Sequence, residues 1–62
     1  PSAALGLLHL EKGDAINHRT FGNGMILSVR PMGNDALLEV AFDAVGTKKL
    51  MLKAAGPHIT KL

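Results

Sequence analysis

The chain has 62 residues, so it can form one domain with a small core, because a chain of this size buries only about 60 % of its unfolded surface. It contains no Cys, which excludes disulfides and thiolate metal sites. Its formal net charge of +2 is too small to indicate a nucleic-acid-binding protein, and two Phe without Trp or Tyr disfavour a methyl-lysine cage or a base-stacking surface.

Residues 1–12 are predicted to be an N-terminal extension or linker remnant, because their first ten positions carry neither a charge pattern nor a helix cap. The first residue is Pro rather than Met, which indicates a piece of a longer chain. The apolar stretch 3–8 is too short for a signal sequence and lacks a basic start. No apolar run approaches the roughly 20 residues that cross a bilayer, so we expect a soluble, cytoplasmic protein without membrane contact.

From residue 13 onward, short apolar segments alternate with turn residues at the spacing of an all-β domain. The predicted strands are residues 14–19, 25–30, 36–42, 47–53 and 58–62. The predicted reversals are residues 20–24, 31–35, 43–46 and 54–57. The last reversal is too short for a stable helix and suits a tight turn, and Pro31 should end the second strand because it has no N–H for the ladder. Five short strands favour a closed or nearly closed barrel, since closure removes exposed edges.

The third predicted strand shows which of its faces is buried. Its residues alternate, so Leu38, Val40 and Phe42 share one face and should point into the core. The remaining side chains of this strand should face outward.

The fourth predicted strand carries a candidate interaction surface. Alternation places Lys49, Met51 and Lys53 on its outer face, with Lys48 at the start of the strand. A solvated strand face would explain the lysines equally well. Met51 favours an interface, because exposed apolar side chains rimmed by charge are typical of protein contacts.

No pattern in the sequence indicates catalysis or a bound cofactor. The order of residues contains no Ser-His-Asp set, paired carboxylates or P-loop, and the glycines of residues 22–24 follow a predicted strand without opening a helix. The histidines His9, His18 and His58 lack metal-ligand spacing. His18 is predicted to be a partly buried residue that hydrogen-bonds the glycine turn, in preference to a ligand or a base. We therefore expect a domain that is not an enzyme.

The segment GDAINHRTFGNG, residues 13–24, resembles the opening of the C-terminal Tudor-like domain of UvrD/PcrA-type DNA helicases. The residues that carry this part of the resemblance are Gly13, Asp14, His18, Phe21, Gly22 and Gly24. The resemblance continues through the third and fourth predicted strands to Ala54-Ala55 and covers about residues 13–62. It implies a small five-stranded SH3-like (Tudor-like) barrel, and a parent chain that is an ATP-dependent DNA helicase.

Three positions depart from the family pattern. Ile16 stands where Val is usual, and Thr20 stands where a basic residue often precedes the aromatic. Near the end, Ala54 and the Gly56-Pro57 step replace a larger residue. These departures concern the partner surface more than the fold.

The resemblance implies a function in protein docking. In such helicases the domain is expected to contact RNA polymerase, through its β subunit, and so to link the helicase to transcription and DNA repair. We expect a monomer without cofactors. The candidate partner-binding residues are Arg19, Lys48, Lys49, Met51 and Lys53.

Two alternatives remain open. The domain could be an auxiliary nucleic-acid-binding barrel of the helicase, as suggested by its net positive charge. The cations behind this alternative are Arg19, Arg30, Lys48, Lys49, Lys53 and Lys61. The barrel could also pack only on its own helicase core.

Overall fold

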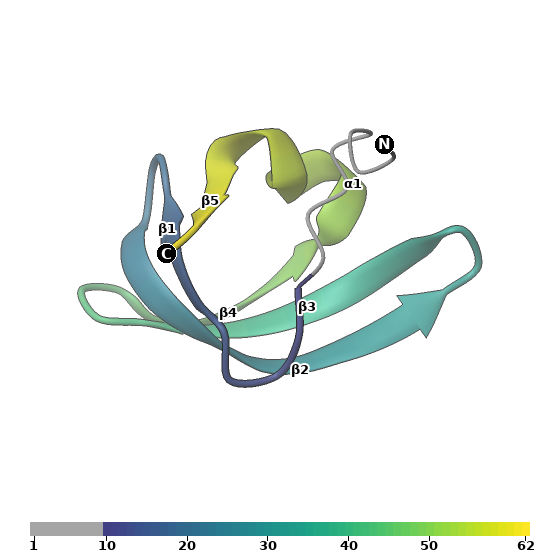
Figure 1. Cartoon of the computed structure of the whole chain (residues 1–62), viewed down its shortest axis with the longest axis horizontal. Helices are drawn as coiled ribbons and strands as arrows, with labels where there is room; N and C mark the ends of the chain where they lie inside the picture. The colour runs from purple at the N-terminus through teal and green to yellow at the C-terminus, as the bar shows by residue number, and fades with distance from the viewer. Residues whose placement is uncertain (1–9) are drawn as a thin grey trace.

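One antiparallel sheet of five strands dominates residues 10–62, which are the residues that this computed structural model describes (Figure 1). The strands are β1 (Ala15–His18), β2 (Gly22–Met32), β3 (Asp35–Phe42), β4 (Gly46–Met51) and β5 (Ile59–Lys61). Between β4 and β5 lie the short helix α1 (Leu52–Ala55) and the 3₁₀ helix η2 (Gly56–His58). The order in the sheet is β4-β3-β2-β1-β5, which confirms the predicted five-stranded, all-β architecture.

The sheet is strongly curved and gives the domain a barrel-like shape (Figure 1). β2 and β3 form a long hairpin, and a β-bulge between Ile26 and Ser28 bends β2. β1 pairs only with residues 22–25 of β2, so the sheet turns back over its own inner face. Within the described residues the two outermost strands, β4 and β5, do not pair with each other, and α1 and η2 connect them.

The core lies on the inner face of the sheet. β3 buries every second residue, and Leu38, Val40 and Phe42 point inward as predicted. The other buried members of this core cluster are Leu10, Ile16, Ile26, Ala55 and Ile59. Leu10, at 7 % exposure, thus packs with the domain, whereas residues 1–9 of the predicted extension lie outside the described residues. Burying each large aliphatic side chain contributes about 1.5–3 kcal/mol to stability.

The prediction that Pro31 ends the second strand is wrong. β2 continues through Pro31, which lies opposite Ala36, and ends at Met32. In the described chain no strand pairs with the other side of this part of β2, and an edge position tolerates a residue without an N–H. The chain reverses at Gly33, whose φ of +65° is a conformation that glycine adopts without steric cost.

The first reversal is shorter than residues 20–24. The turn occupies residues 19–21, and the glycine-containing segment 22–24 belongs to β2, where it pairs with β1. Gly22 begins the strand with a φ of +86°. The glycines therefore serve the start of a strand as well as the turn before it.

The predictions for the end of the fourth strand are also wrong, because β4 ends at Met51 and the chain then forms α1. Oδ1 of Asp35 accepts hydrogen bonds from the backbone N–H of Lys53 (2.9 Å) and from that of Ala36 (2.7 Å). These bonds, first the one from Lys53, lower the pKa of Asp35 below its ordinary value. Asp35 thus caps a helix that follows a different strand, a contact that local sequence could not indicate. None of the described helices has the length and apolar character needed to span a membrane.

Candidate functional site

His18 is buried beneath the turn that joins β1 to β2. Only 6 % of the residue is exposed, and its Nδ1 accepts hydrogen bonds from the backbone N–H groups of Thr20 (3.0 Å) and Phe21 (3.2 Å). An Nδ1 that accepts two hydrogen bonds carries no proton, so the ring is neutral and protonated at Nε2. His18 therefore forms the hydrogen bonds to the adjacent turn that the sequence predicted.

Aromatic rings surround His18. The Phe21 ring stacks on it at a centroid distance of 4.6 Å, and the Phe42 ring meets it edge-on at 5.9 Å. The ring of His58 lies 6.0 Å away. Burial is the main cause that lowers the pKa of His18, and the nearby His58 lowers it further. Both causes favour the neutral ring, which suits a structural residue.

Gly24 permits the close approach of β2 and β3. A Cβ atom at this position would lie 2.8 Å from the backbone oxygen of Ala41 and 2.8 Å from Cδ1 of Phe42. Real Cβ atoms essentially never approach other heavy atoms this closely, so a side chain here would push the two strands apart. The glycine is therefore required by packing.

Gly13 and Asp14 organise the turn that enters β1. The N–H of Gly13 donates to the oxygen of Ile26 (2.8 Å), and Gly13 has a φ of +93°. Oδ2 of Asp14 accepts a hydrogen bond from the N–H of Glu11 (2.7 Å) and lies 3.4 Å from Nζ of Lys61. The resemblance motif of residues 13–24 thus consists largely of residues that hold the chain in shape.

The five predicted partner-binding residues fall into three separate places. Lys49 and Met51 lie on the outer face of β4, as predicted. Lys53 does not share that strand face, because it belongs to α1. The single strand row predicted for Lys49, Met51 and Lys53 is therefore wrong in its last member.

The other two predicted residues lie near the buried ring of His18 and the rings of Phe21, Phe42 and His58, which we call the His18 cluster. Lys48 is on the opposite face of β4 from Lys49, and its Nζ stands 5.3 Å from the centre of the Phe21 ring. Arg19 lies in the turn between β1 and β2, where its Nη1 is 3.4 Å from Nδ1 of His58. Two cations therefore flank the aromatic end of the barrel.

Sheet register brings further residues to the outer face beside Lys49 and Met51. Leu37 of β3 pairs with Met51, and Glu39 pairs with Lys49. On the other side of β3, Arg30 of β2 pairs with Leu37. We call Arg30, Leu37, Lys49 and Met51 the outer docking face. The alternation of β3 already pointed Leu37 outward, but Arg30 could not be placed beside it without the register.

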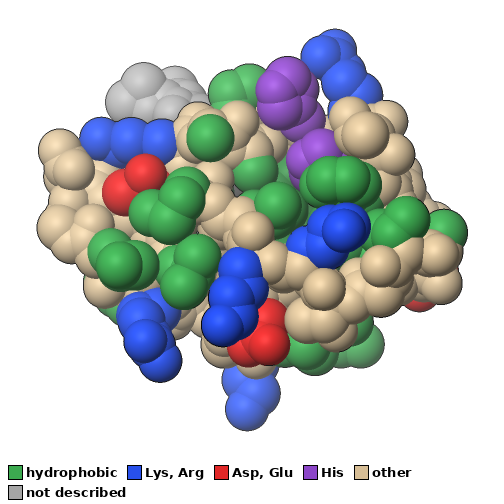
Figure 2. Space-filling model, turned by 180° about the vertical axis from the view of Figure 1, so that it is seen from behind, with side chains coloured by type: hydrophobic (Ala, Val, Ile, Leu, Met, Phe, Trp, Pro, Cys, Tyr) green, Lys and Arg blue, Asp and Glu red, His purple; other side chains and the backbone are tan. Residues whose placement is uncertain are grey.

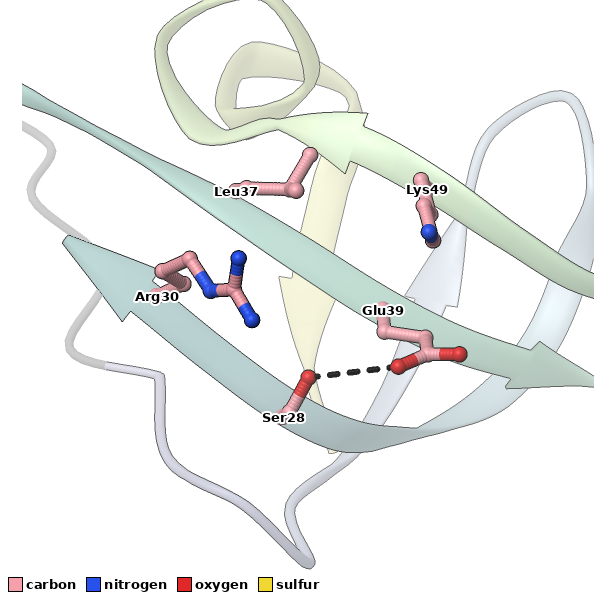
Figure 3. Close-up of a pocket in the computed structure, with 5 residues that line it drawn as sticks. All are labelled: Ser28, Arg30, Leu37, Glu39 and Lys49. Carbon is pink, nitrogen blue, oxygen red and sulfur yellow. Dashed lines mark hydrogen bonds between the residues drawn. The ribbon is translucent and has the colours of Figure 1, made fainter. Parts of the chain in front are cut away.

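Figure 3 shows a shallow hollow on this outer docking face. The residues that line it are Ser28, Arg30, Leu37, Glu39 and Lys49. Oγ of Ser28 donates a hydrogen bond to Oε1 of Glu39 over 3.4 Å. The hollow measures about 80 Å³, whereas pockets for small-molecule ligands hold about 300–1,000 Å³. The hollow is therefore too small for such a ligand.

The exposed methionines add apolar area to the same side of the sheet. Met25 and Met32 are each 49 % exposed and Met51 is 36 % exposed, and these are the three methionines of the chain. Their paired residues on β3 are Ala41, Asp35 and Leu37, all on the outward face of that strand. Figure 2 shows hydrophobic side chains gathered among Lys and Arg side chains on one side of the molecule. Flexible thioethers of this kind adapt to partner surfaces.

Within residues 10–62, no group of three or more His, Cys, Asp or Glu side chains could hold a metal ion. On the outer face of the sheet, exposed cationic side chains lie beside apolar ones.

Comparison with known proteins agrees with the resemblance seen in the sequence. The family model described as the PcrA/UvrD tudor domain matches residues 13–61. No curated protein matches the chain. The match spans most of the chain and all five strands, so the chain belongs to the PcrA/UvrD tudor domain family.

Proposed function

We propose that this domain docks a UvrD/PcrA-type DNA helicase on RNA polymerase, through the β subunit, and so links the helicase to transcription and DNA repair. The family match supports a helicase accessory domain, which is not itself catalytic. On this proposal the ATP-dependent motor lies elsewhere in the parent chain, and the domain acts as a monomer in the cytoplasm.

The outer docking face is the observation that carries this proposal. It combines an exposed methionine, Met51, and the half-buried Leu37 with the cations Arg30 and Lys49. Apolar contact area surrounded by charge is the usual composition of a protein interface. The arrangement suits a partner surface that is acidic and partly apolar.

The size of the domain predicts modest affinity. One face of a 62-residue chain offers less than about 1,200 Å² of total interface, which is the range of weak and transient complexes. Attachment to a motor that is already bound to DNA would raise the effective concentration of the domain near a polymerase on the same DNA. Weak docking is therefore sufficient for recruitment.

The second candidate function, nucleic-acid binding, is less well supported by the geometry. Phe42 is buried, and the Phe21 ring has His18 stacked on it and Lys48 above it, so neither phenylalanine offers an open face to a base. The cations are also dispersed over the turn, the outer face and α1. Lys61, a further cation, lies within ion-pair distance of Asp14.

Charge reversal on β4 tests the docking proposal. We expect that Lys48→Glu combined with Lys49→Glu abolishes capture of purified RNA polymerase by the immobilised domain at near-physiological salt, with nuclease present. Lys12→Glu is the control for a single reversal, because Lys12 is exposed in the turn before β1, and β2 and β3 separate β1 from β4 in the sheet. An amide NMR spectrum that is unchanged outside β4, β3 and the turn that contains Phe21 checks the fold.

A parallel assay with labelled duplex DNA separates the two functions. Capture of polymerase without DNA binding supports docking. DNA binding alone, with log K falling by about 0.9 per phosphate contact as log salt rises, supports the nucleic-acid function and contradicts docking. Capture by the double variant at the wild-type level would remove β4 from the proposed interface.

A further inference from the structure

The two edges of the sheet differ in the length of backbone that they leave unpaired. β5 has only three residues, and its Lys61 lies within ion-pair distance of Asp14 of the same domain. β4 has six residues, all paired with β3 on one side. Within residues 10–62 no strand pairs with its other side. An open edge of this length presents a row of N–H and C=O groups to any extended segment that can reach them.

We propose that the open edge of β4 accepts an extended acidic segment of the docking partner as a sixth strand. This inference rests on the proposed docking function and specifies how the partner is held. Backbone hydrogen bonds between the strands supply affinity, and the alternating side chains supply specificity.

The positions of the lysines define the sequence that such a segment needs. Lys48 and Lys49 are consecutive, so they point to opposite faces of the sheet, and the structure places Lys48 near Phe21 and Lys49 opposite Glu39. A strand beside β4 also alternates. Two adjacent acidic residues, one on each face, can therefore both lie next to a lysine.

The last two residues of β4 should pair with apolar residues of the partner segment. Leu50 is half-buried toward the inner face, and Met51 is exposed on the outer face. The recognised segment therefore carries two adjacent acidic residues followed or preceded by two apolar residues, according to strand direction. Strand addition at this edge would bring the partner close to Lys49 on the outer face and to Lys48 on the opposite face.

Charge also excludes a second copy of this domain as the occupant. The six residues of β4, GTKKLM, contain two lysines and no acid, so two such edges cannot form opposite-charge pairs with each other. Lysines at a sheet edge commonly prevent association between like chains. The same lysines attract an acidic strand, so they select the partner as well as protect the edge.

Synthetic peptides and residue-resolved hydrogen exchange test this inference. The probe is an extended peptide with two adjacent glutamates next to two valines, flanked by threonines. In the free domain, every second N–H of β4 points away from β3 and exchanges with solvent. We expect the peptide to protect those alternate amides and to leave the exchange of the β3-bonded amides unchanged.

A peptide of the same composition is the matched control. Its two glutamates are separated by one residue, so both face the same side of the sheet and only one lies next to a lysine. We expect about 1.5- to 5-fold weaker binding, which is the value of one cross-strand ion pair. The variant with Lys48→Glu and Lys49→Glu should prefer a peptide in which two lysines replace the glutamates.

Equal affinity for the two glutamate peptides, or binding without alternate protection in β4, would overturn strand addition. Capture of RNA polymerase tests the docking proposal separately, and hydrogen exchange of the domain in the captured complex tests strand addition. Capture of polymerase without alternate protection overturns strand addition and leaves docking supported. Absence of polymerase capture overturns the docking proposal itself.

Discussion

The His18 cluster and the outer docking face both combine polar and apolar side chains but use them in opposite ways. At the His18 cluster a histidine is buried, accepts two backbone hydrogen bonds and is enclosed by rings. On the outer docking face, Lys49 and Met51 remain exposed. The first region holds the chain in shape, and the second has its polar and apolar groups available to a partner. Burial, more than residue type, separates the two roles.

The residues of the resemblance motif belong largely to the structural region. The motif of residues 13–24 surrounds the turn that His18 supports and the strand that contains Gly24. Those positions have few acceptable residues because backbone conformation and packing restrict them. The exposed positions of β4, for which we propose a docking role, are less restricted by backbone conformation and packing.

Lys48 connects the His18 cluster with β4, the strand that carries Lys49 and Met51. Its backbone belongs to the edge strand β4, whereas its ammonium group lies over the ring of Phe21, which stacks on His18. A change at Lys48 should therefore affect stability and docking, while a change at Lys49 should affect docking alone. Substitutions in the two regions should therefore differ in their effects on stability.

Gly24→Ala should cause the largest loss of stability. The added methyl group would lie 2.8 Å from the oxygen of Ala41, so β2 and β3 must separate. We expect a cost of about 1–3 kcal/mol in the free energy of unfolding, measured by urea denaturation. Gly56→Ala is the control, because its nearest side-chain atom, Cδ1 of Leu52, is 3.9 Å away and its φ is −49°. Equal effects of the two substitutions would contradict the packing role of Gly24.

Acid should destabilise the His18 cluster. The folded state lowers the pKa of His18 below 6.5, through burial and then His58, so the unfolded chain binds more protons in that range. The contribution of neutral His18 to the free energy of unfolding is complete above about pH 7. It declines as the pH falls through the pKa of histidine in the unfolded chain toward the lower pKa of His18 in the folded domain. The urea midpoint should therefore be lower at pH 5.5 than at pH 7.5.

His18→Gln provides the comparison, because its amide oxygen can accept hydrogen bonds but does not titrate. The variant should be less stable than the wild type at pH 7.5 and should show a smaller change between the two pH values. Measurements above pH 5 keep Asp35, whose pKa is lowered by the Lys53 and Ala36 N–H groups, in its charged form. Equal pH dependence in both proteins would show that His18 is not the titrating group.

Substitutions at the two adjacent lysines should have the smallest effects on stability. Lys49→Thr should change the free energy of unfolding by less than about 0.5 kcal/mol, as is usual for exposed strand positions. Lys48→Thr should cost about 0.5–1 kcal/mol, because it removes the cation from the Phe21 ring. Thermal unfolding of both variants measures the difference. A larger loss of stability for Lys49→Thr than for Lys48→Thr would assign the structural role to Lys49 and contradict this prediction.

Much of the fold could be predicted from local patterns. The period-two alternation of Leu38, Val40 and Phe42 indicated the buried face of β3, because successive strand residues point to opposite sides. The position of His18 next to a glycine-rich turn indicated its hydrogen bonding. Both predictions depend on residues that are close in sequence.

The errors arose where distant segments meet. Asp35 caps α1 across 18 positions of sequence, which ends β4 at Met51 and removes Lys53 from the strand. Pro31 lies inside β2 because β1 is too short to reach it. For the candidate site, alternation placed Lys49 and Met51, but only the pairing of β2 with β3 brought Arg30 beside Leu37.

The amino-acid sequence by itself determined the strand pattern, the turn glycines and the family, because these depend on side-chain periodicity and backbone freedom within short segments. The tertiary structure decided which strand lies at the open edge, which lysine faces the Phe21 ring and which residues surround Met51. Those features depend on strand order and register. Both are settled by burial of the whole core, which no short segment can specify.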